Sequence, residues 1–580
     1  MQALSQTMAG RVHGIGNKRV RRGNWFAAIS AALCIFLAML ILVPIANILY
    51  DVFWAHAPGA SPFDQLGSAK AALTVLANTS LVLGVAAILA VFFGSLFAWL
   101  NERTDVEMSW ASKVLPIIPL LLPPIAGSIG WVMLASDRAG LLNVWGKRLL
   151  EFMGIQTDGP LVSIFSWSGL IFVYLIYTLP HVYLCVASAL RNLDPSLEEA
   201  SRVNGAGPLK TLVKVTLPAV LPAIISGGTI SIIYGIALFS VPAIIASQAG
   251  IDILAVKIVN LMMAEFPPKT GAALLFGLVI VVVISVMTWI QRRVISSGKF
   301  ATIGGKGAQV TLVKLGWVRW PARMLLLGYI LVATILPFGT LFLVSLQRFW
   351  TANIDWSRLS FRHYLNVFGN SFASQGILNS LTLAISVATV VMFVTALIAF
   401  RMYTSRNWLV TGAIDFTLKL PATISNLVIG MAFIVMFAGA PFYLHGTLTI
   451  LLLAYAVLYL PQASIIASSA IAQVGRQLQE ASSVAGASEG KTFFRIMFPL
   501  MLPGLVAGWT MLFVLLAGDL TASAMLSGTG NPVIGSVILN LWTEGSFAPV
   551  AAFATVVSII MASVVLTVMW ISERLTQRSR

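Results

Sequence analysis

The chain has 580 residues, of which 58% are hydrophobic and only 10% are charged, and its formal net charge is +16. Soluble globular proteins carry about 25% charged residues, so this composition excludes a soluble domain and indicates a protein whose main solvent is lipid. The basic residues cluster between apolar runs, as membrane topology requires, and we therefore expect no nucleic-acid partner. The composition predicts an all-α integral membrane protein in contact with the lipid bilayer.

Twelve apolar runs follow a basic N-terminal segment, residues 1–24. A membrane-spanning helix needs about 20 apolar residues, and the runs are close to that length. The first run is too long for the core of a cleaved signal peptide and lacks a small-residue cleavage site, so we expect it to be retained as a span. The predicted spans are 25–49, 79–100, 114–135, 161–190, 213–247, 272–291, 324–346, 380–400, 412–437, 446–470, 499–526 and 550–572.

Lys and Arg predict the orientation of these spans. With the N-terminus placed inside, 27 of these residues fall on the cytoplasmic side and nine on the opposite side. The positive-inside rule then predicts a multi-pass protein with both termini in the cytoplasm, including a tail at 573–580. The basic linker, 292–323, also falls inside, and its Gly-containing stretch at 304–307 is typical of a flexible connector.

Two cytoplasmic segments are similar to each other. Residues 199–227 and 480–508 align without a gap and are identical at 12 of 29 positions, most of them polar, small or helix-breaking. Shared hydrophobicity does not explain such a match. Weaker matches upstream divide the chain into two halves, 25–291 and 324–572, with six spans each in the same orientation. The first half contains an insertion in the outside loop around 137–160.

The repeated motif reads Glu-Ala-Ser, then a glycine four residues later, then an apolar-Pro pair about a dozen residues beyond it. Its residues are Glu199, Ala200, Ser201 and Gly205 in the first copy, and Glu480, Ala481, Ser482 and Gly486 in the second. This pattern resembles the cytoplasmic coupling loop of ABC-importer permeases. The whole chain is similar to a fused, two-copy permease subunit of a binding-protein-dependent ABC importer.

The resemblance implies a fold and partners. The fold is the type I (MetI-like) permease fold, with twelve transmembrane helices as two parallel six-helix repeats and coupling loops near 196–214 and 477–495. The implied partners are a homodimer of ABC ATP-binding subunits in the cytoplasm and a periplasmic solute-binding protein, in a bacterial inner membrane. Among permeases of this kind the chain looks most like those for ferric iron, so iron(III) is the expected solute. Import of 2-aminoethylphosphonate, thiamine or polyamine is the alternative within the class.

The chain itself is expected to bind neither ATP nor another cofactor. Residues 485–492 come within one residue of the phosphate-binding pattern G-x-x-x-x-G-K-[ST], but alanine replaces the first glycine and no strand is predicted before it. The ATP of the transport cycle is therefore assigned to the partner subunit. The five histidines are scattered without ligand spacing, so no metal site is predicted in the chain.

Three carboxylates are candidate functional residues. Glu199 and Glu480 are predicted to pair with basic residues of the ATP-binding subunits; the alternative is that they only stabilise the start of a short helix. Asp519 falls within the run 499–526, and a carboxylate inside a membrane is a functional-site hypothesis by default, here for the translocation path. The alternative for Asp519 is a packing role, bonded to a nearby Ser or Thr.

A twelve-span secondary transporter is the alternative from another class, since such proteins also have two parallel six-span halves. It predicts coupling carboxylates near the middle of the membrane and no docking loops. Asp519 is nearly alone as a buried acid, and the two paired loops favour the ABC importer.

Overall fold

The computed structural model describes residues 25–54, 61–106, 108, 115–296, 312–405, 407–424, 426–474, 476–528 and 530–578. These residues form helices joined by short loops, and the one β pairing among them is a bridge between Thr104 and Val313. The predicted N-terminal segment, 1–24, and the centre of the linker, 297–311, lie outside the described residues. The predicted tail begins inside the last helix, which continues to Arg578.

The helices follow the division into two halves. The first half contains α2 (Trp25–Phe53), α3 (Pro62–Gln65), α4 (Ala69–Arg103), η1 (Leu115–Leu121), α6 (Pro124–Ala135), α7 (Leu141–Phe152), α8 (Trp167–Asn192), α9 (Pro195–Val203), α10 (Pro208–Thr211), η2 (Leu212–Thr216), α11 (Leu217–Ala237), α12 (Ser240–Ile244), α13 (Ala246–Ala249), α14 (Leu254–Met263) and α15 (Thr270–Ser296). The second half contains η3 (Gly316–Val318), α16 (Arg319–Ile330), η4 (Leu331–Ile335), α17 (Leu336–Leu346), η5 (Trp356–Arg358), α18 (Arg362–Gly369), α19 (Ser371–Thr404), α20 (Trp408–Lys419), η6 (Leu420–Thr423), α21 (Asn426–Phe437), α22 (Leu448–Leu458), α23 (Leu460–Val474), α24 (Arg476–Val484), α25 (Glu489–Thr492), η7 (Phe493–Met497), α26 (Phe498–Ala517), α27 (Thr521–Leu526), α28 (Ile534–Thr543) and α29 (Phe547–Arg578).

Nine helices in the described residues are long and apolar enough to cross a membrane, or eleven if two bent pairs each form one span. The sequence predicted twelve, and the difference is the run 114–135, which the structure divides into η1 and α6. Pro119 lies inside η1, and Pro123 and Pro124 lie at the junction with α6. Prolines lack the N–H that an α-helix needs, so this run cannot form one uninterrupted span. The corresponding run of the second half is also broken, with a bend of 96° between α20 and α21.

The first helix of each half packs against the other half. On α2, the ring of Phe26 lies 5.6 Å from the rings of both Phe400 and Phe493 in the second half. On α16, the ring of Tyr329 lies 5.3 Å from that of Phe97, and its hydroxyl donates to the carbonyl of Ile176 at 3.3 Å. The two halves therefore interlock, although the sequence divides cleanly at the linker.

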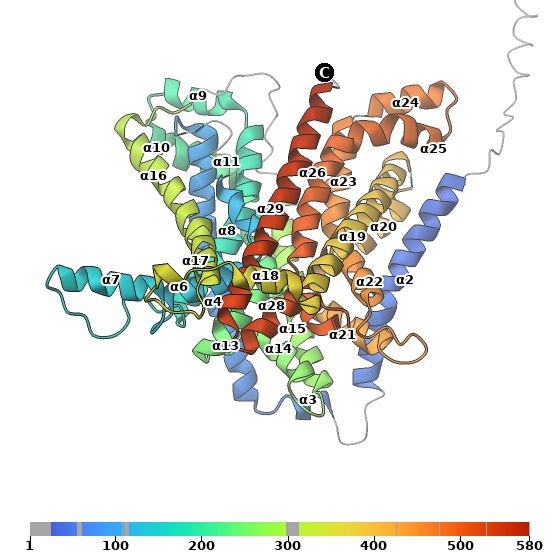
Figure 1. Ribbon diagram of the computed structural model, residues 1–580. Helices are drawn as coiled ribbons and strands as arrows, with labels where there is room; N and C mark the ends of the chain where they lie inside the picture. Colours follow the sequence, from blue (N-terminus) through green and yellow to red (C-terminus); the bar gives the residue numbers. More distant parts are fainter. Residues whose placement is uncertain are drawn as a thin grey trace, which may run out of the picture.

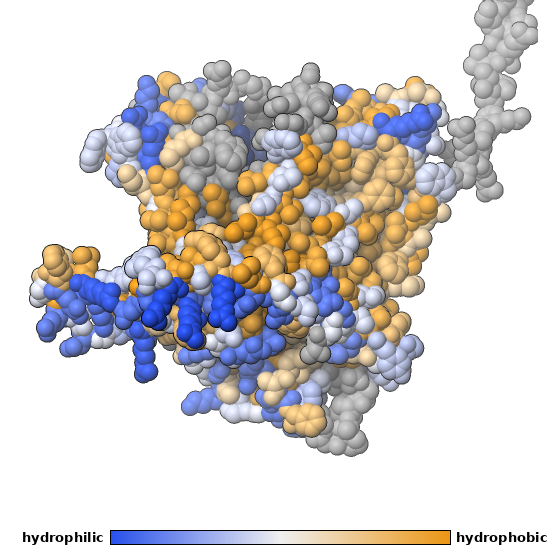
Figure 2. Space-filling view, viewed as in Figure 1, coloured by the Kyte–Doolittle hydropathy of each residue, from blue (hydrophilic) through white to orange (hydrophobic). Residues whose placement is uncertain are grey.

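The short helices α9 and α24 lie at one end of the bundle, together with the C-terminal end of α29 (Figure 1). The start of α2 lies there too, because Trp25 packs against Gly490 so closely that a Cβ on this glycine would come within 2.6 Å of the indole. Helices α3, α13 and α14 lie toward the opposite end (Figure 1). Figure 2 shows a hydrophobic band across the bundle, with a row of hydrophilic residues along the edge farther from α9 and α24.

Candidate coupling helices and central site

Helices α9 and α24 occupy the two repeated loops, and each is nine residues long. Asp194 caps the start of α9, where its carboxylate accepts the backbone N–H of Ser196 at 2.9 Å. This hydrogen bond lowers the pKa of Asp194, because it stabilises the charged form. The carboxylate therefore stays ionised, and its negative charge interacts favourably with the positive end of the helix dipole.

Both helices end in the same left-handed turn. Gly205 has a φ of +75° and Gly486 a φ of +76°, a conformation that glycine adopts without steric cost. The next residue closes the turn in each copy: Ala206 donates its N–H to the carbonyl of Ser201, and Ala487 donates to that of Ser482, each at 3.1 Å. The motif glycines therefore have a geometric reason at both positions.

The motif serines point inward and hold each short helix to the next one. The hydroxyl of Ser201 lies 3.0 Å from that of Thr211, and the hydroxyl of Ser482 lies 2.8 Å from that of Thr492. The π-helical segments η2 and η7 begin directly after these threonines and lead into α11 and α26. Each short helix is thus fixed to the long helix that follows it. The structure places Ser482 inside the protein, whereas the sequence analysis grouped it with residues that contact a partner.

The outward faces of the two short helices are also alike. Glu199 and Ala200 on α9 are exposed, as are Glu480 and Ala481 on α24. Apolar side chains flank them at helical spacing and stay exposed: Leu197 by 43% and Val203 by 87% on α9, and Leu478 by 45% and Val484 by 89% on α24. None of these four residues was among the site residues predicted from the sequence. Their signal was an apolar residue repeated every three positions in an otherwise polar segment.

The first short helix has a buried ionic anchor that sequence analysis also missed. Glu198 is 4% exposed, its Oε2 lies 3.5 Å from Nε of Arg103, and its Oε1 accepts the hydroxyl of Thr216 at 2.6 Å. The guanidinium also donates to two backbone carbonyls at the end of α8. The second half carries Gln479 and Thr404 at the corresponding positions and lacks this pair. The two loops are therefore alike on the outside and anchored differently inside.

Asp519 lies at a break between helices, which corrects its predicted place inside a continuous span. Helix α26 ends at Ala517 and α27 begins at Thr521. The carboxylate is largely buried, with a residue exposure of 9%. It accepts the N–H groups of Ala522 at 3.0 Å and Ser523 at 3.4 Å, and the hydroxyl of Tyr459 at 3.3 Å. The hydroxyl of Ser523 also donates to the backbone carbonyl of Asp519 at 2.9 Å, so a nearby serine of the kind that the packing alternative named does contact this residue.

The break at Asp519 has a counterpart in the first half and contacts it. Helix α11 ends at Ala237, at the corresponding point, and the carbonyl of Ala237 accepts the hydroxyl of Thr521 at 3.1 Å. Helix α28 closes over the break at Gly535, where a Cβ would lie 2.7 Å from the Asp519 carbonyl oxygen. The break is thus joined to the first half through Thr521 and covered by α28 of the second half.

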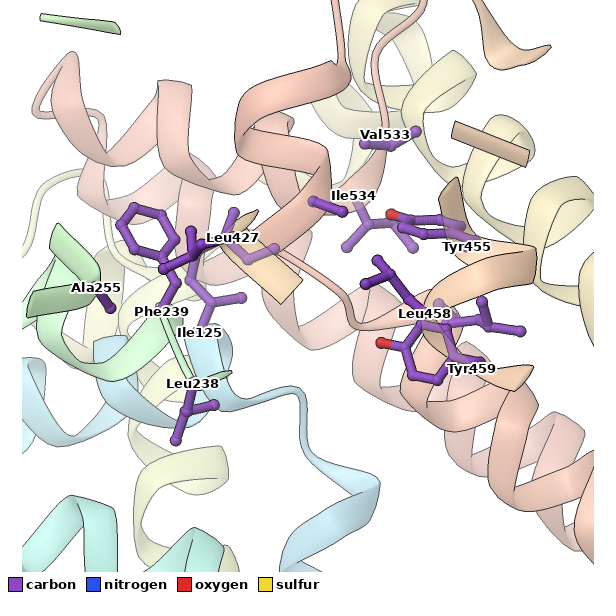
Figure 3. Close-up of a cluster of buried hydrophobic side chains, with 14 of the residues drawn as sticks. Ile125, Leu238, Phe239, Ala255, Leu427, Tyr455, Leu458, Tyr459, Val533 and Ile534 are labelled. Atoms are coloured by element: carbon purple, nitrogen blue, oxygen red, sulfur yellow. The ribbon is translucent and has the colours of Figure 1, made fainter. Parts of the chain in front are cut away.

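An apolar cluster from both halves adjoins Tyr459 (Figure 3). The close-up shows Tyr455, Leu458 and Tyr459 on one side, and Ile125 with Leu427 on the other. All of these residues are buried and belong to one hydrophobic core. The members drawn and labelled there are Ile125, Leu238, Phe239, Ala255, Leu427, Tyr455, Leu458, Tyr459, Val533 and Ile534. We call this set the central cluster. Apolar side chains of the two halves thus belong to the same buried core as the tyrosine that bonds Asp519.

Known proteins resemble the chain over most of its length. Residues 90–297 and 392–580 match the family described as binding-protein-dependent transport system inner membrane component. The ferric transport system permease protein FbpB of Actinobacillus pleuropneumoniae is 24% identical over 506 residues, which are 86% of this chain and 71% of the relative. The putative 2-aminoethylphosphonate transport system permease protein PhnV of Salmonella paratyphi A is 26% identical over 247 residues, 42% of this chain and 89% of the relative. A solved bacterial ABC transporter involved in alginate import aligns with a TM-score of 0.38 and 17% identity, over 45% of this chain and 96% of that chain.

The two family matches fall one in each half, so the internal repeat is a duplication of this domain. Together they cover more than half of the chain, and this decides against the secondary-transporter alternative. The many apolar spans agree with a multi-pass protein of the inner membrane. The chain therefore belongs to the binding-protein-dependent transport system inner membrane components, as a fused, two-copy permease subunit of an ABC importer.

Proposed function

We propose that the chain forms the translocation path of an ATP-driven importer and is powered by a separate homodimer of ATP-binding subunits. One subunit docks on α9 and the other on α24, and both short helices and both termini face the cytoplasm. The observation that carries this proposal is the pair of matching outward faces, each with an exposed glutamate and an exposed valine at equivalent positions. The separation of Lys and Arg, 27 on one side and nine on the other, supports the orientation.

Each outward face suits a shallow groove with a basic rim. Exposed valines at 87% and 89% contribute favourably when a partner removes them from water. Glu199 and Glu480 lie beside these apolar residues and are placed to pair with Arg or Lys at the rim. When a docked ATP-binding subunit moves, its movement is transmitted to α11 and α26 through the Ser–Thr hydroxyl pairs, because these pairs connect each short helix to the next long one.

We further propose that the transported solute is iron(III), delivered by a periplasmic solute-binding protein. The ferric transport permeases among the relatives support this choice. The buried carboxylate of Asp519 and the hydroxyl of Tyr459 are oxygen donors, which hard cations prefer. We propose that both lie along the translocation path. Import of 2-aminoethylphosphonate, thiamine or polyamine remains the alternative in the same class, and the first of these also has a relative.

Co-purification tests the docking proposal. The ATP-binding subunit is co-expressed with wild type, with Glu480→Lys and with Glu199→Lys/Glu480→Lys, and uptake of labelled iron(III) is measured alongside. A lysine on the docking face places a like charge against a basic rim, so the double variant should lose both the subunit and uptake. Glu544→Lys reverses an exposed charge beyond α28 and is the matched control. Normal subunit binding and uptake in the double variant would reject these helices as the docking sites.

A further inference from the structure

Helix α7, in the insertion that the second half lacks, projects sideways from the bundle (Figure 1). It lies beside the row of hydrophilic residues that borders the hydrophobic band on the side away from α9 and α24 (Figure 2). In a membrane protein, such a border between hydrophobic and hydrophilic surface is expected where the acyl chains of the bilayer give way to headgroups. A helix that extends past the spans at this level lies where membrane lipid surrounds the protein.

The surface of α7 has two opposed faces. Four apolar residues recur with helical spacing and are exposed: Leu142 by 36%, Trp145 by 44%, Leu149 by 61% and Phe152 by 90%. At about 3.6 residues per turn they share one side of the helix. We call them the apolar stripe. Lys147 and Glu151 project from the other side by the same geometry, and Arg148 lies at the flank of the stripe next to Phe152.

The base of α7 is fixed, so its direction is set by the fold. The side chain of Asn143, 1% exposed, donates to the carbonyls of Ser136 at 2.8 Å and Val162 at 2.7 Å. Its Oδ1 accepts the N–H of Val162 at 2.9 Å, which closes the insertion at its neck. Farther along, Arg148 donates to the side chain of Asn353 in the second half. The orientation of α7 relative to the bundle is therefore fixed, and so are the directions in which its two faces point.

We propose that α7 lies in the plane of the membrane at the headgroup level of the outer leaflet, with its apolar stripe inserted among the acyl chains. The occupant of the stripe is the phospholipid bilayer itself, because α7 projects from the bundle at the edge of the hydrophobic band of the spans (Figures 1 and 2). Trp145 has the amphipathic ring that favours this depth, and the cationic side chain of Lys147, opposite the stripe, reaches phosphate groups. The first half of the chain thus has a lipid-anchored arm that the second half does not.

The test places a fluorophore on single cysteines of the full chain in nanodiscs of phosphatidylethanolamine and phosphatidylglycerol, after Cys34 and Cys185 have been replaced by alanine. Leu149→Cys and Phe152→Cys report on the stripe, and Lys147→Cys and Glu151→Cys are matched controls on the opposite face. Phospholipids with a nitroxide near the headgroup serve as quenchers. Quenching at the stripe should exceed that at the controls by about threefold or more.

Equal quenching on the two faces overturns the proposal. Protection of the stripe from the lipid quenchers that depends on protein concentration also overturns the proposal, since a second copy would then be the occupant. Protection that requires an added solute-binding protein overturns it as well. A second measurement uses the wild-type chain and needs no cysteine variant. A phospholipid with a photoreactive group near the headgroup should label peptides from 141–155 as strongly as peptides from the spans, and a lack of adducts there overturns the proposal.

Discussion

The hydroxyl of Ser482 lies 2.8 Å from the hydroxyl of Thr492, and the same contact recurs 281 positions earlier between Ser201 and Thr211 at 3.0 Å. Ser482 is 6% exposed and Thr492 is 3% exposed, so both members of the pair in the second half are buried. A hydrogen bond kept at both sites of a duplicated motif joins a surface helix to the helix that enters the membrane. The contact gives a physical role to a serine that the motif alone leaves open.

A double-mutant cycle on Ser482→Ala and Thr492→Val should give a coupling energy of about 0.5–1.5 kcal/mol in unfolding experiments, the usual net value of one hydrogen bond. Uptake should fall in either single variant, because the short helix is then less firmly tied to α26. Ser483→Ala is the control, since that hydroxyl donates to the carbonyl of Gln479 in its own helix at 2.9 Å. Strictly additive single-variant effects would show that the pair does not interact.

Gly205→Ala should destabilise the protein by about 1–2 kcal/mol, because a residue with a Cβ pays this cost at positive φ. Gly207→Ala is the matched control: this glycine has a φ of −69°, and nothing lies within 4 Å of a Cβ there. Thermal unfolding and co-purification of the ATP-binding subunit measure the two variants. A Gly205→Ala protein as stable as the control would mean that the turn can rearrange.

Glu198→Gln should destabilise the first half by about 3–5 kcal/mol, since it leaves the guanidinium of Arg103 buried without its carboxylate. The double variant Arg103→Thr/Glu198→Gln copies the residues that the second half carries at these positions and should recover much of the loss. Unfolding in denaturant compares the two. If the double variant is as unstable as the single one, the ion pair is not what holds α9.

Asp519→Asn should reduce uptake by about tenfold or more while leaving insertion and subunit binding unchanged. An ionisable residue inside a membrane is energetically costly, so its presence there indicates a function that needs the carboxylate. Asparagine has nearly the same shape, but its one side-chain oxygen can replace only one of the two carboxylate oxygens, which accept the N–H of Ala522 and the hydroxyl of Tyr459 separately. Tyr459→Phe tests the partner of the carboxylate separately. Wild-type uptake in Asp519→Asn would leave the carboxylate with a packing role.

Membrane-impermeant thiol labelling of intact cells tests the proposed orientation. Val203→Cys and Val484→Cys sit on the short helices, and Phe266→Cys sits in the loop after α14 with 99% exposure. Only the cysteine at 266 should react from outside, because the positive-inside rule places the short helices in the cytoplasm. Efficient labelling at 203 or 484 before lysis would show that the short helices face outward and would contradict the proposed topology.

The amino-acid sequence determined the lipid-facing composition, the apolar runs, the duplication and the two motif loops. These features follow from local chemistry: the hydrophobicity of about 20 residues in a row predicts a span wherever that run lies in the fold. The glycine in each motif was equally readable, because a left-handed turn favours glycine at that position in any context. The prolines at 119, 123 and 124 were also visible in the sequence, although the run that contains them, 114–135, was still predicted as one of the twelve spans.

Only the tertiary structure decided which neighbouring carboxylate turns inward. Glu198 and Glu199 are adjacent on a short polar helix, and the sequence directed attention to the second. Glu198 is buried because Arg103, 95 positions away, meets it at the end of α4. The exchange of the first helices between halves, the break at Asp519 and the direction of α7 have the same origin. Each depends on packing between segments far apart in the chain, and helical periodicity carries no information about such partners.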